Sequence, residues 1–171
     1  MLVDGKWEGP IVDQHMHLDR ENRFISAAEE FSRSGGTEIF LVHKPSFSKS
    51  LPTDLNGYRE VYRDTIKMAE SVREKTELKV NVVLGPHPVV WDIQANDIGV
   101  KASSELHISA VGLALDMIEE GEAVCLGEVG RPHYPVSEDR WTEANDLLLE
   151  IMRMASTSNS PVQLHLSLIH I

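Results

Sequence analysis

Two histidines, His15 and His17, stand one residue apart at the end of the short apolar segment 10–17, PIVDQHMH. Successive side chains of a β-strand alternate between its two faces, so both imidazoles and the carboxylate of Asp13 would project from the same face. Two imidazoles side by side can hold one cation, although they can also be ordinary polar residues that leave a strand. Whether His15 and His17 bind a cation or are ordinary polar residues depends on which side chains the other segments place near them.

Four further apolar segments end in, or close to, a histidine or an acid. The segments are 37–43, 78–88, 123–129 and 161–165, and the polar residues are His43, His87, Glu128 and His165. Runs of this length that are rich in Val, Ile and Leu are typical of parallel strands buried on both faces. Because parallel strands direct their carboxyl ends toward one rim, we expect these side chains to meet there.

Glu128 has the strongest chemical reason to be functional. The surrounding sequence AVCLGEVG indicates a buried strand, where an ionised carboxylate is costly unless it is paired or bound to a cation. A salt bridge to Arg131 or a raised pKa would satisfy it without a metal. With imidazoles converging from other strands, a cation is the simpler partner. Imidazole and carboxylate ligands together suit Zn, Mn, Fe, Ni or Co better than Ca.

The chemistry expected of such a cluster is hydrolysis by metal-activated water. Two divalent cations (Zn, Mn or Mg) about 3.5–4 Å apart that share the Glu128 carboxylate would polarise a substrate and make a bridging water more acidic. Glu128 is then the predicted catalytic residue. His87, which stands between two prolines in GPHP, and Arg131 are predicted to bind the substrate, with Lys44 as a further candidate.

Amphipathic segments between the apolar runs predict helices, and these segments are 22–34, 54–75, 103–120 and 138–156. Asp54 and Ser137 are suited to cap the N-termini of the second and fourth of these helices. Alternating strands and helices indicate an α/β fold with a parallel sheet. The segment 44–54, rich in Ser and Pro, is expected to be a surface loop beside the strand ends.

Composition excludes several classes of function. The 171 residues carry a formal net charge of -11, which repels nucleic acid phosphates and anionic membranes at long range, although bound divalent cations could reverse the local sign. The single cysteine, Cys125, cannot form an intramolecular disulfide and favours a cytoplasmic location. We find no signal segment and no run of about 18 apolar residues, so no membrane association is expected. Nothing indicates a stable protein partner.

Four motifs occur in an order that resembles the TatD-related metal-dependent hydrolases of the amidohydrolase superfamily. They are VDQHMHLD (12–19), GPHP (85–88), GEVG (127–130) and QLH (163–165). The sequence GRPHYPV that follows Glu128 resembles the archaeal-type branch in particular. The resemblance implies that His15 and His17 bind one metal, that His165 binds a second and that Glu128 bridges both. It also implies a phosphodiesterase or deoxyribonuclease, and hence a nucleic-acid or small-molecule phosphodiester substrate.

The same resemblance implies a (β/α)8 TIM-type barrel, which needs about 250 residues and eight strands. The 171 residues contain five predicted strands, so the expected fold is an incomplete barrel of about five of the eight βα units over residues 1–165. Residues 166–171, LSLIHI, have neither turn residues nor a helix start and are predicted to be a non-native tail. Since the family's ligands from strands six and eight are missing, we expect this fragment to be inactive.

Two other functions remain open at this point. An amidohydrolase acting on amide or cyclic amide bonds is one, although many of these bridge their metals through a modified lysine where this chain has Glu128. A non-catalytic fragment or binding protein that kept the metal-like residues is the other. Metal content separates this last reading from both enzyme readings.

Overall fold

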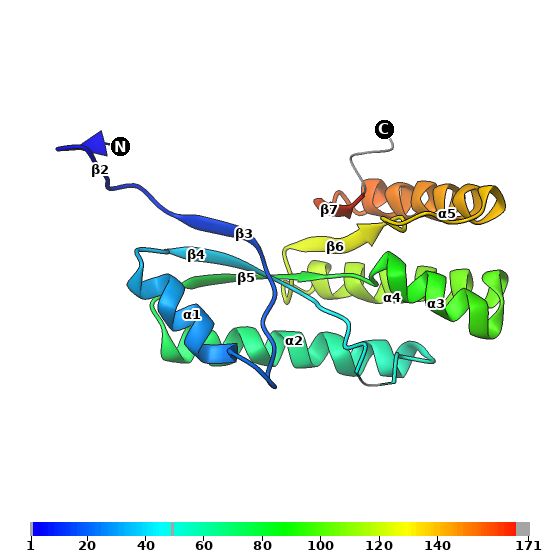
Figure 1. Ribbon diagram of the computed structural model, residues 1–171, viewed down its shortest axis with the longest axis horizontal. Helices are drawn as coiled ribbons and strands as arrows, with labels where there is room; N and C mark the ends of the chain where they lie inside the picture. Colours follow the sequence, from blue (N-terminus) through cyan, green and yellow to red (C-terminus); the bar gives the residue numbers. More distant parts are fainter. Residues whose placement is uncertain (1, 49, 167–171) are drawn as a thin grey trace.

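The computed structural model describes residues 2–48 and 50–166. Its main feature is a parallel sheet with the strand order β3-β4-β5-β6-β7, so that each strand pairs with the next one along the chain. These strands are β3 (Val12–Met16), β4 (Glu38–Val42), β5 (Lys79–Leu84), β6 (Cys125–Gly130) and β7 (Val162–His165). A short antiparallel hairpin of β1 (Leu2–Val3) and β2 (Lys6–Trp7) precedes them (Figure 1).

The sequential strand order identifies the architecture. A doubly wound sheet reverses its order at a switch point, whereas parallel strands that follow one another in sequence, joined by helices, build a TIM-type barrel. Strands β3 and β7 are the two edges of the sheet, yet the side-chain amide of Gln163 in β7 donates to the backbone carbonyl of Gln14 in β3 at 2.6 Å. This contact shows that the sheet is curled. The prediction of an α/β fold that forms an incomplete TIM-type barrel is therefore confirmed.

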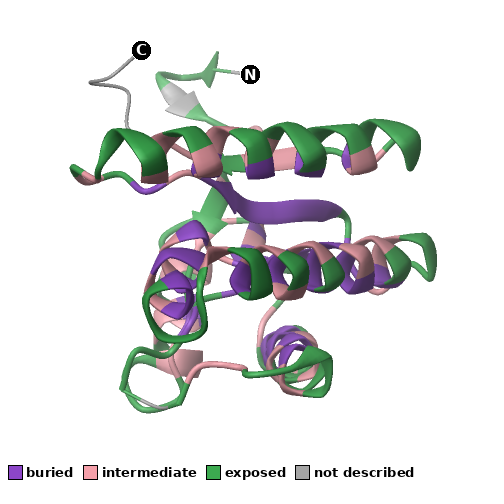
Figure 2. Ribbon diagram, turned by 90° about the vertical axis from the view of Figure 1, so that its right-hand side faces the viewer, coloured by how far each residue is buried: buried purple, intermediate pink, exposed green. Residues whose placement is uncertain are grey.

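Helices connect the strands and cover the sheet. They are α1 (Phe24–Arg33), α2 (Leu55–Lys75), α3 (Pro88–Ile98), α4 (Val100–Glu119) and α5 (Glu138–Thr157). Figure 2 shows that the helices turn their buried residues inward and their exposed residues outward, which is the pattern expected of amphipathic helices on a core. Asp54 and Ser137 accept the backbone N–H groups of Gly57 and Arg140, so both predicted N-caps are confirmed.

One helix was not predicted from the sequence. The apolar run 78–88 was expected to be a single strand, but β5 ends at Leu84 and α3 begins at Pro88. Helix α3 is buried on several sides, at Val90, Trp91 and Ala95 among others, so its sequence lacks the single apolar stripe by which a surface helix is recognised. Proline at the first helical position is well placed, since its missing N–H would have no partner there.

The ends of the chain bear on two sequence predictions. The proposed non-native tail lies outside the described residues apart from Leu166, and the boundary at residue 165 stays a prediction. No helix in the described part of the chain is long and apolar enough to cross a membrane.

Candidate metal centre

The paired histidines lie at the end of β3 with their rings nearly perpendicular. Nε2 of His15 is 3.1 Å from Nε2 of His17, and the ring centroids are 4.8 Å apart. Nδ1 of His17 donates to the backbone carbonyl of Val42 at 3.0 Å, so in the neutral ring Nε2 carries a lone pair. The Asp13 carboxylate accepts the backbone N–H of His15 at 2.9 Å, and this hydrogen bond fixes the local backbone conformation. The pair can thus offer adjacent nitrogen ligands to one cation.

Glu128 lies within β6, whose six residues are all buried. Its Oε2 is 3.4 Å from Nε2 of His15 and 3.5 Å from Nε2 of His17, and its Oε1 is 2.5 Å from Nδ1 of His165. Every ion pair of this carboxylate within the described residues is to a histidine, and none is to a lysine or arginine. A buried carboxylate in such surroundings is one that a divalent cation would neutralise.

The protonation state of Glu128 is compatible with a cation. Burial acts to raise the pKa of the carboxyl, but hydrogen bonds from His165 and His17 outweigh it and hold the pKa well below its usual range. The hydrogen bond with Glu128 is in turn the main reason why the pKa of His17 is raised. The carboxylate is therefore charged at neutral pH, as a metal ligand must be.

Glycines on both sides of Glu128 explain how the neighbouring strand comes so close. A Cβ atom on Gly127 would lie 2.7 Å from Cβ of Gln163, and one on Gly130 would overlap the backbone carbonyl of His165. Gly130 and His165 are also register partners in the β6–β7 ladder. The sequence GEVG thereby allows β7 to place the His165 ring beside the carboxylate.

His165 contacts a further histidine that was not among the predicted site residues. Its Nε2 is 2.7 Å from Nδ1 of His133, which follows β6 in the GRPHYPV segment, and the two rings are 4.8 Å apart. Ligating histidines commonly hold their second ring nitrogen by a hydrogen bond that sets the tautomer. His133 is placed to fix the tautomer of His165 in this way. In the sequence, the one indication of such a role is that His133 follows shortly after Glu128.

His87 lies beside the cluster but in a different chemical state. Its Nε2 is 3.8 Å from Oε2 of Glu128, while its Nδ1 caps α3 by accepting the backbone N–H of Val89 at 3.2 Å. Burial lowers the pKa of His87 to about 4, so the ring is neutral at pH 7. Since Nδ1 is the acceptor, Nε2 carries the proton. This histidine therefore presents an N–H donor to the site rather than a lone pair.

Arg131 and Lys44, the cationic residues named from the sequence, each contact a partner outside the cluster of histidines around Glu128, and their binding of a substrate stays a prediction. Arg131 donates to Oδ1 of Asn145 at 2.8 Å and stacks its guanidinium over the Trp141 ring at 4.6 Å, so its described contacts are with α5. Lys44 is paired with Asp19 at 3.0 Å. The structure thus brings His15, His17, Glu128, His165 and His87 together, and it places Arg131 against a helix.

Two overlapping groups of residues could hold a cation. One is His15, His17 and Glu128, the other is His87, Glu128 and His165, and the ligand atoms within each group lie within 4.8 Å of one another. Because Nε2 of His87 carries a proton, His165 and Glu128 are the better donors of the second group. The donor set fits divalent cations that accept both nitrogen and oxygen ligands.

Comparison with known proteins gives this geometry a context. The family model described as TatD related DNase matches residues 12–169. An uncharacterized protein of Methanocaldococcus jannaschii is 27% identical over 159 residues, which make up 91% of this chain and 54% of that protein.

A solved structure is similar in fold. It is the crystal structure of an uncharacterized amidohydrolase from Saccharomyces cerevisiae, with a TM-score of 0.57 and 14% sequence identity over 93% of this chain and 49% of that one. The chain therefore spans about half the length of the proteins it matches.

Proposed function

The chain belongs to the TatD-related DNase family, and we propose on that premise that it carries the metal-binding part of a hydrolase that cleaves phosphodiesters. Divalent cations would be held by His15, His17, Glu128 and His165. The observation that supports this most strongly is the buried carboxylate of Glu128, which is surrounded by imidazoles and forms no ion pair with any described lysine or arginine.

The two oxygens of Glu128 divide the ligands into two sets. Oε2 faces His15 and His17, and Oε1 faces Nδ1 of His165. His15 and His17 would hold one cation and His165 a second, and Glu128 would serve as a ligand of both. Zn or Mn would suit this mixture of nitrogen and oxygen donors better than Mg. When bound, such a pair of cations polarises the substrate and lowers the pKa of water toward neutrality.

His87 has a separate role in the proposal. Its Nε2–H lies at the edge of the cluster, 3.8 Å from Oε2 of Glu128, and burial keeps the ring neutral. A neutral N–H donor can stabilise negative charge that develops on a substrate oxygen without competing for a cation. We therefore assign to His87 the binding of a substrate oxygen.

The chain spans about half the length of its relatives, so we assign the activity to the whole barrel. We expect this chain alone to bind cations and to hydrolyse phosphodiesters weakly or not at all. Its edge strands β3 and β7 are joined across the curled sheet by the hydrogen bond from Gln163 to Gln14.

Cation uptake by the purified chain tests the proposal. After equilibration with Zn²⁺ or Mn²⁺ and gel filtration, elemental analysis should find at least one divalent cation per chain. A protein continued to the length of its relatives should hydrolyse bis(p-nitrophenyl) phosphate and lose that activity when EDTA is added. A folded chain that takes up no divalent cation would overturn the proposal.

A further inference from the structure

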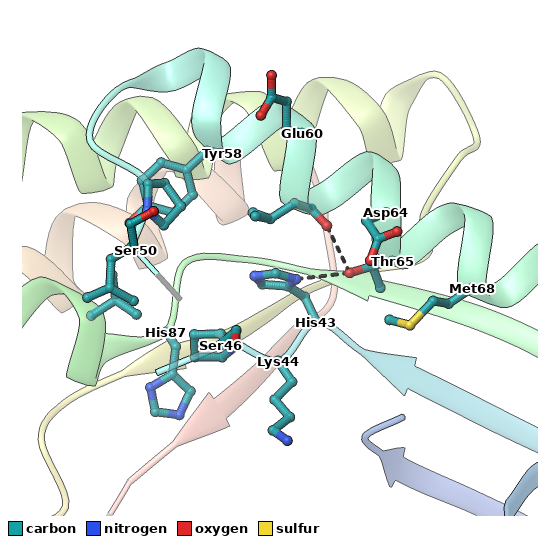
Figure 3. Close-up of a pocket in the computed structure, with 15 residues that line it drawn as sticks. His43, Lys44, Ser46, Ser50, Tyr58, Glu60, Asp64, Thr65, Met68 and His87 are labelled. Carbon is teal, nitrogen blue, oxygen red and sulfur yellow. Dashed lines mark hydrogen bonds between the residues drawn. The ribbon is translucent and has the colours of Figure 1, made fainter. Parts of the chain in front are cut away.

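A pocket of about 310 Å³ lies next to the metal cluster, between the loop that follows β4 and the first half of α2. Its apolar lining includes Leu51, Tyr58, Val61, Met68 and Val90. The residues that line the pocket come from the segment 43–52 that follows β4, from α2, and from His87 and Val90 at the start of α3 (Figure 3). Its volume is at the lower end of the roughly 300–1,000 Å³ found for small-molecule sites, so it can take one ring system.

The buried residue His43 contributes a hydrogen-bond acceptor to this pocket. The Thr65 hydroxyl lies 3.1 Å from the backbone carbonyl of Val61, which can only accept, and 2.9 Å from Nδ1 of His43. Both contacts are hydrogen bonds at once only when the hydroxyl donates to the carbonyl and accepts from Nδ1. This arrangement puts the ring proton on Nδ1. Burial lowers the pKa of His43 to about 4, so the ring is neutral at pH 7 and Nε2 has a lone pair.

The acceptor atom points into the cavity. Figure 3 shows the second ring nitrogen of His43 turned away from Thr65, toward the side of the pocket where Tyr58 and Ser50 lie. His43 is only 7% exposed, and no hydrogen bond to its Nε2 is found within the described part of the chain. Because Nε2 opens into the pocket, an N–H or O–H group of an occupant can pair with it.

The charges around the pocket disfavour an anionic occupant. Among the described residues that line it, Lys44 is the one lysine or arginine, and its ammonium is paired with Asp19 at 3.0 Å. The carboxylates of Glu60 and Asp64 also line the pocket. A phosphate in this place would meet negative charge and would have no unpaired cation to bind.

His87 connects the pocket with the metal cluster. It is one of the residues that line the pocket, and its Nε2 is 3.8 Å from Oε2 of Glu128. A molecule whose ring fills the pocket can therefore extend past His87 toward the carboxylate. The two sites are complementary, because one suits a neutral ring and the other a negatively charged group.

We propose that this pocket binds a neutral, nitrogen-bearing planar ring of nucleobase size through an N–H donor directed at Nε2 of His43. The ring would be the part of a phosphodiester substrate next to the bond that is cleaved, and this second step rests on the hydrolase function proposed above. The bound ring would hold the phosphate near Glu128 and His87.

Adenosine is a suitable probe because it is neutral and has an exocyclic amino group. We expect it to bind the chain in the presence of EDTA, as measured by isothermal titration calorimetry, whereas purine riboside, which lacks the amino group, should bind about tenfold more weakly. The substitution His43→Phe removes both ring nitrogens. It should lower the affinity for adenosine about tenfold and leave the affinity for purine riboside unchanged.

Thr65→Val provides a milder variant in case His43→Phe fails to fold. It removes the group that holds the proton on Nδ1, so adenosine affinity should fall while the apolar lining is kept. Ser71→Ala is the matched control, since the Ser71 hydroxyl also donates to a carbonyl one turn earlier in α2 but Ser71 does not line the pocket. Long-range ¹H–¹⁵N spectra should show the proton of His43 on Nδ1.

Two results would overturn the proposal. One is a folded chain that does not bind adenosine at millimolar concentration, and the other is adenosine binding that is unchanged in His43→Phe and Thr65→Val. Neither result affects the metal proposal, which is tested by cation uptake. The coupling of the sites is tested with adenosine 5′-monophosphate, which should bind more tightly than adenosine only when Zn²⁺ or Mn²⁺ is present.

Discussion

Nδ1 of His165 lies 2.5 Å from Oε1 of Glu128, although 37 positions separate the two residues in the chain. The contact arises because β6 and β7 are parallel neighbours and Gly130 is the register partner of His165. The other oxygen of the same carboxylate is 3.4 Å from Nε2 of His15 on β3. Glu128 is therefore the point at which side chains from both edges of the curled sheet meet.

Glu128→Gln should abolish the binding of at least one cation. The amide keeps the size of the side chain but removes the negative charge that the imidazoles surround. Elemental analysis of the purified variant should find fewer cations per chain than in the unmodified chain. Glu119→Gln, at an exposed position at the end of α4, is the control and should bind as before. Equal metal content in both variants would show that Glu128 is not a ligand.

His133 should influence cation affinity through His165. When a cation occupies Nδ1 of His165, the ring proton must sit on Nε2, and Nδ1 of His133 is 2.7 Å away as its acceptor. His133→Phe should weaken cation binding by roughly 10–100-fold, as measured by competition with a chelating dye. His133→Gln restores an acceptor and should recover part of the affinity. If Phe and Gln behave alike, the hydrogen bond has no positioning role.

Gly85 should be sensitive to the addition of a single methyl group. A Cβ atom there would lie 2.9 Å from the backbone of Gly127, one residue before Glu128. Gly85→Ala should lower the free energy of unfolding by about 1–3 kcal/mol, since backbone must move to make room. Urea denaturation measures this.

Gly112→Ala is the matched control for Gly85→Ala. Its new methyl group would find its nearest neighbour, Cε of Met154, at 3.9 Å. Because alanine favours a helix over glycine by roughly 0.5–1 kcal/mol, this variant should be slightly more stable than the unmodified chain. A loss of stability in both variants would mean that the close approach of Gly85 to Gly127 is not the cause.

His107 should make the chain less stable in mild acid. The side chain is fully buried, and burial lowers its pKa to about 3. The unfolded chain takes up a proton at this residue below about pH 6.5, whereas the folded chain does not until a much lower pH. The free energy of unfolding should therefore be unaffected by His107 above pH 6.5 and fall below it, by up to about 1.4 kcal/mol per pH unit.

His107→Leu isolates this contribution. Both ring nitrogens of His107 lack a hydrogen-bond partner within the described residues, so leucine leaves no new polar group unpaired. Urea denaturation between pH 7 and pH 5 should give a smaller decrease in stability for the variant than for the unmodified chain. Part of the decrease should persist, because the pKa values of His43 and His87 are also lowered, each to about 4. Parallel stability curves would contradict the prediction.

The sequence was sufficient to locate, along the chain, the five strands of the parallel sheet and most of the helices. Short apolar runs and amphipathic stretches have different periods, and caps such as Asp54 mark where helices begin. Helix α3 was missed because its buried residues do not form a single stripe. The stacking of the Arg131 guanidinium on Trp141 was not predicted either, because no local pattern encodes a contact between a loop and a helix. The binding of a substrate by Arg131 stays a prediction.

The sequence by itself determined which donor types reach the rim, because strand periodicity and the common direction of parallel strands place His15, Glu128 and His165 at corresponding ends. Only the tertiary structure decided which nitrogen of each imidazole faces the carboxylate. A histidine has two ring nitrogens, and the proton goes to the one that finds an acceptor. For His17 that acceptor is the carbonyl of Val42 on the neighbouring strand, so its chemical state depends on how the strands pack.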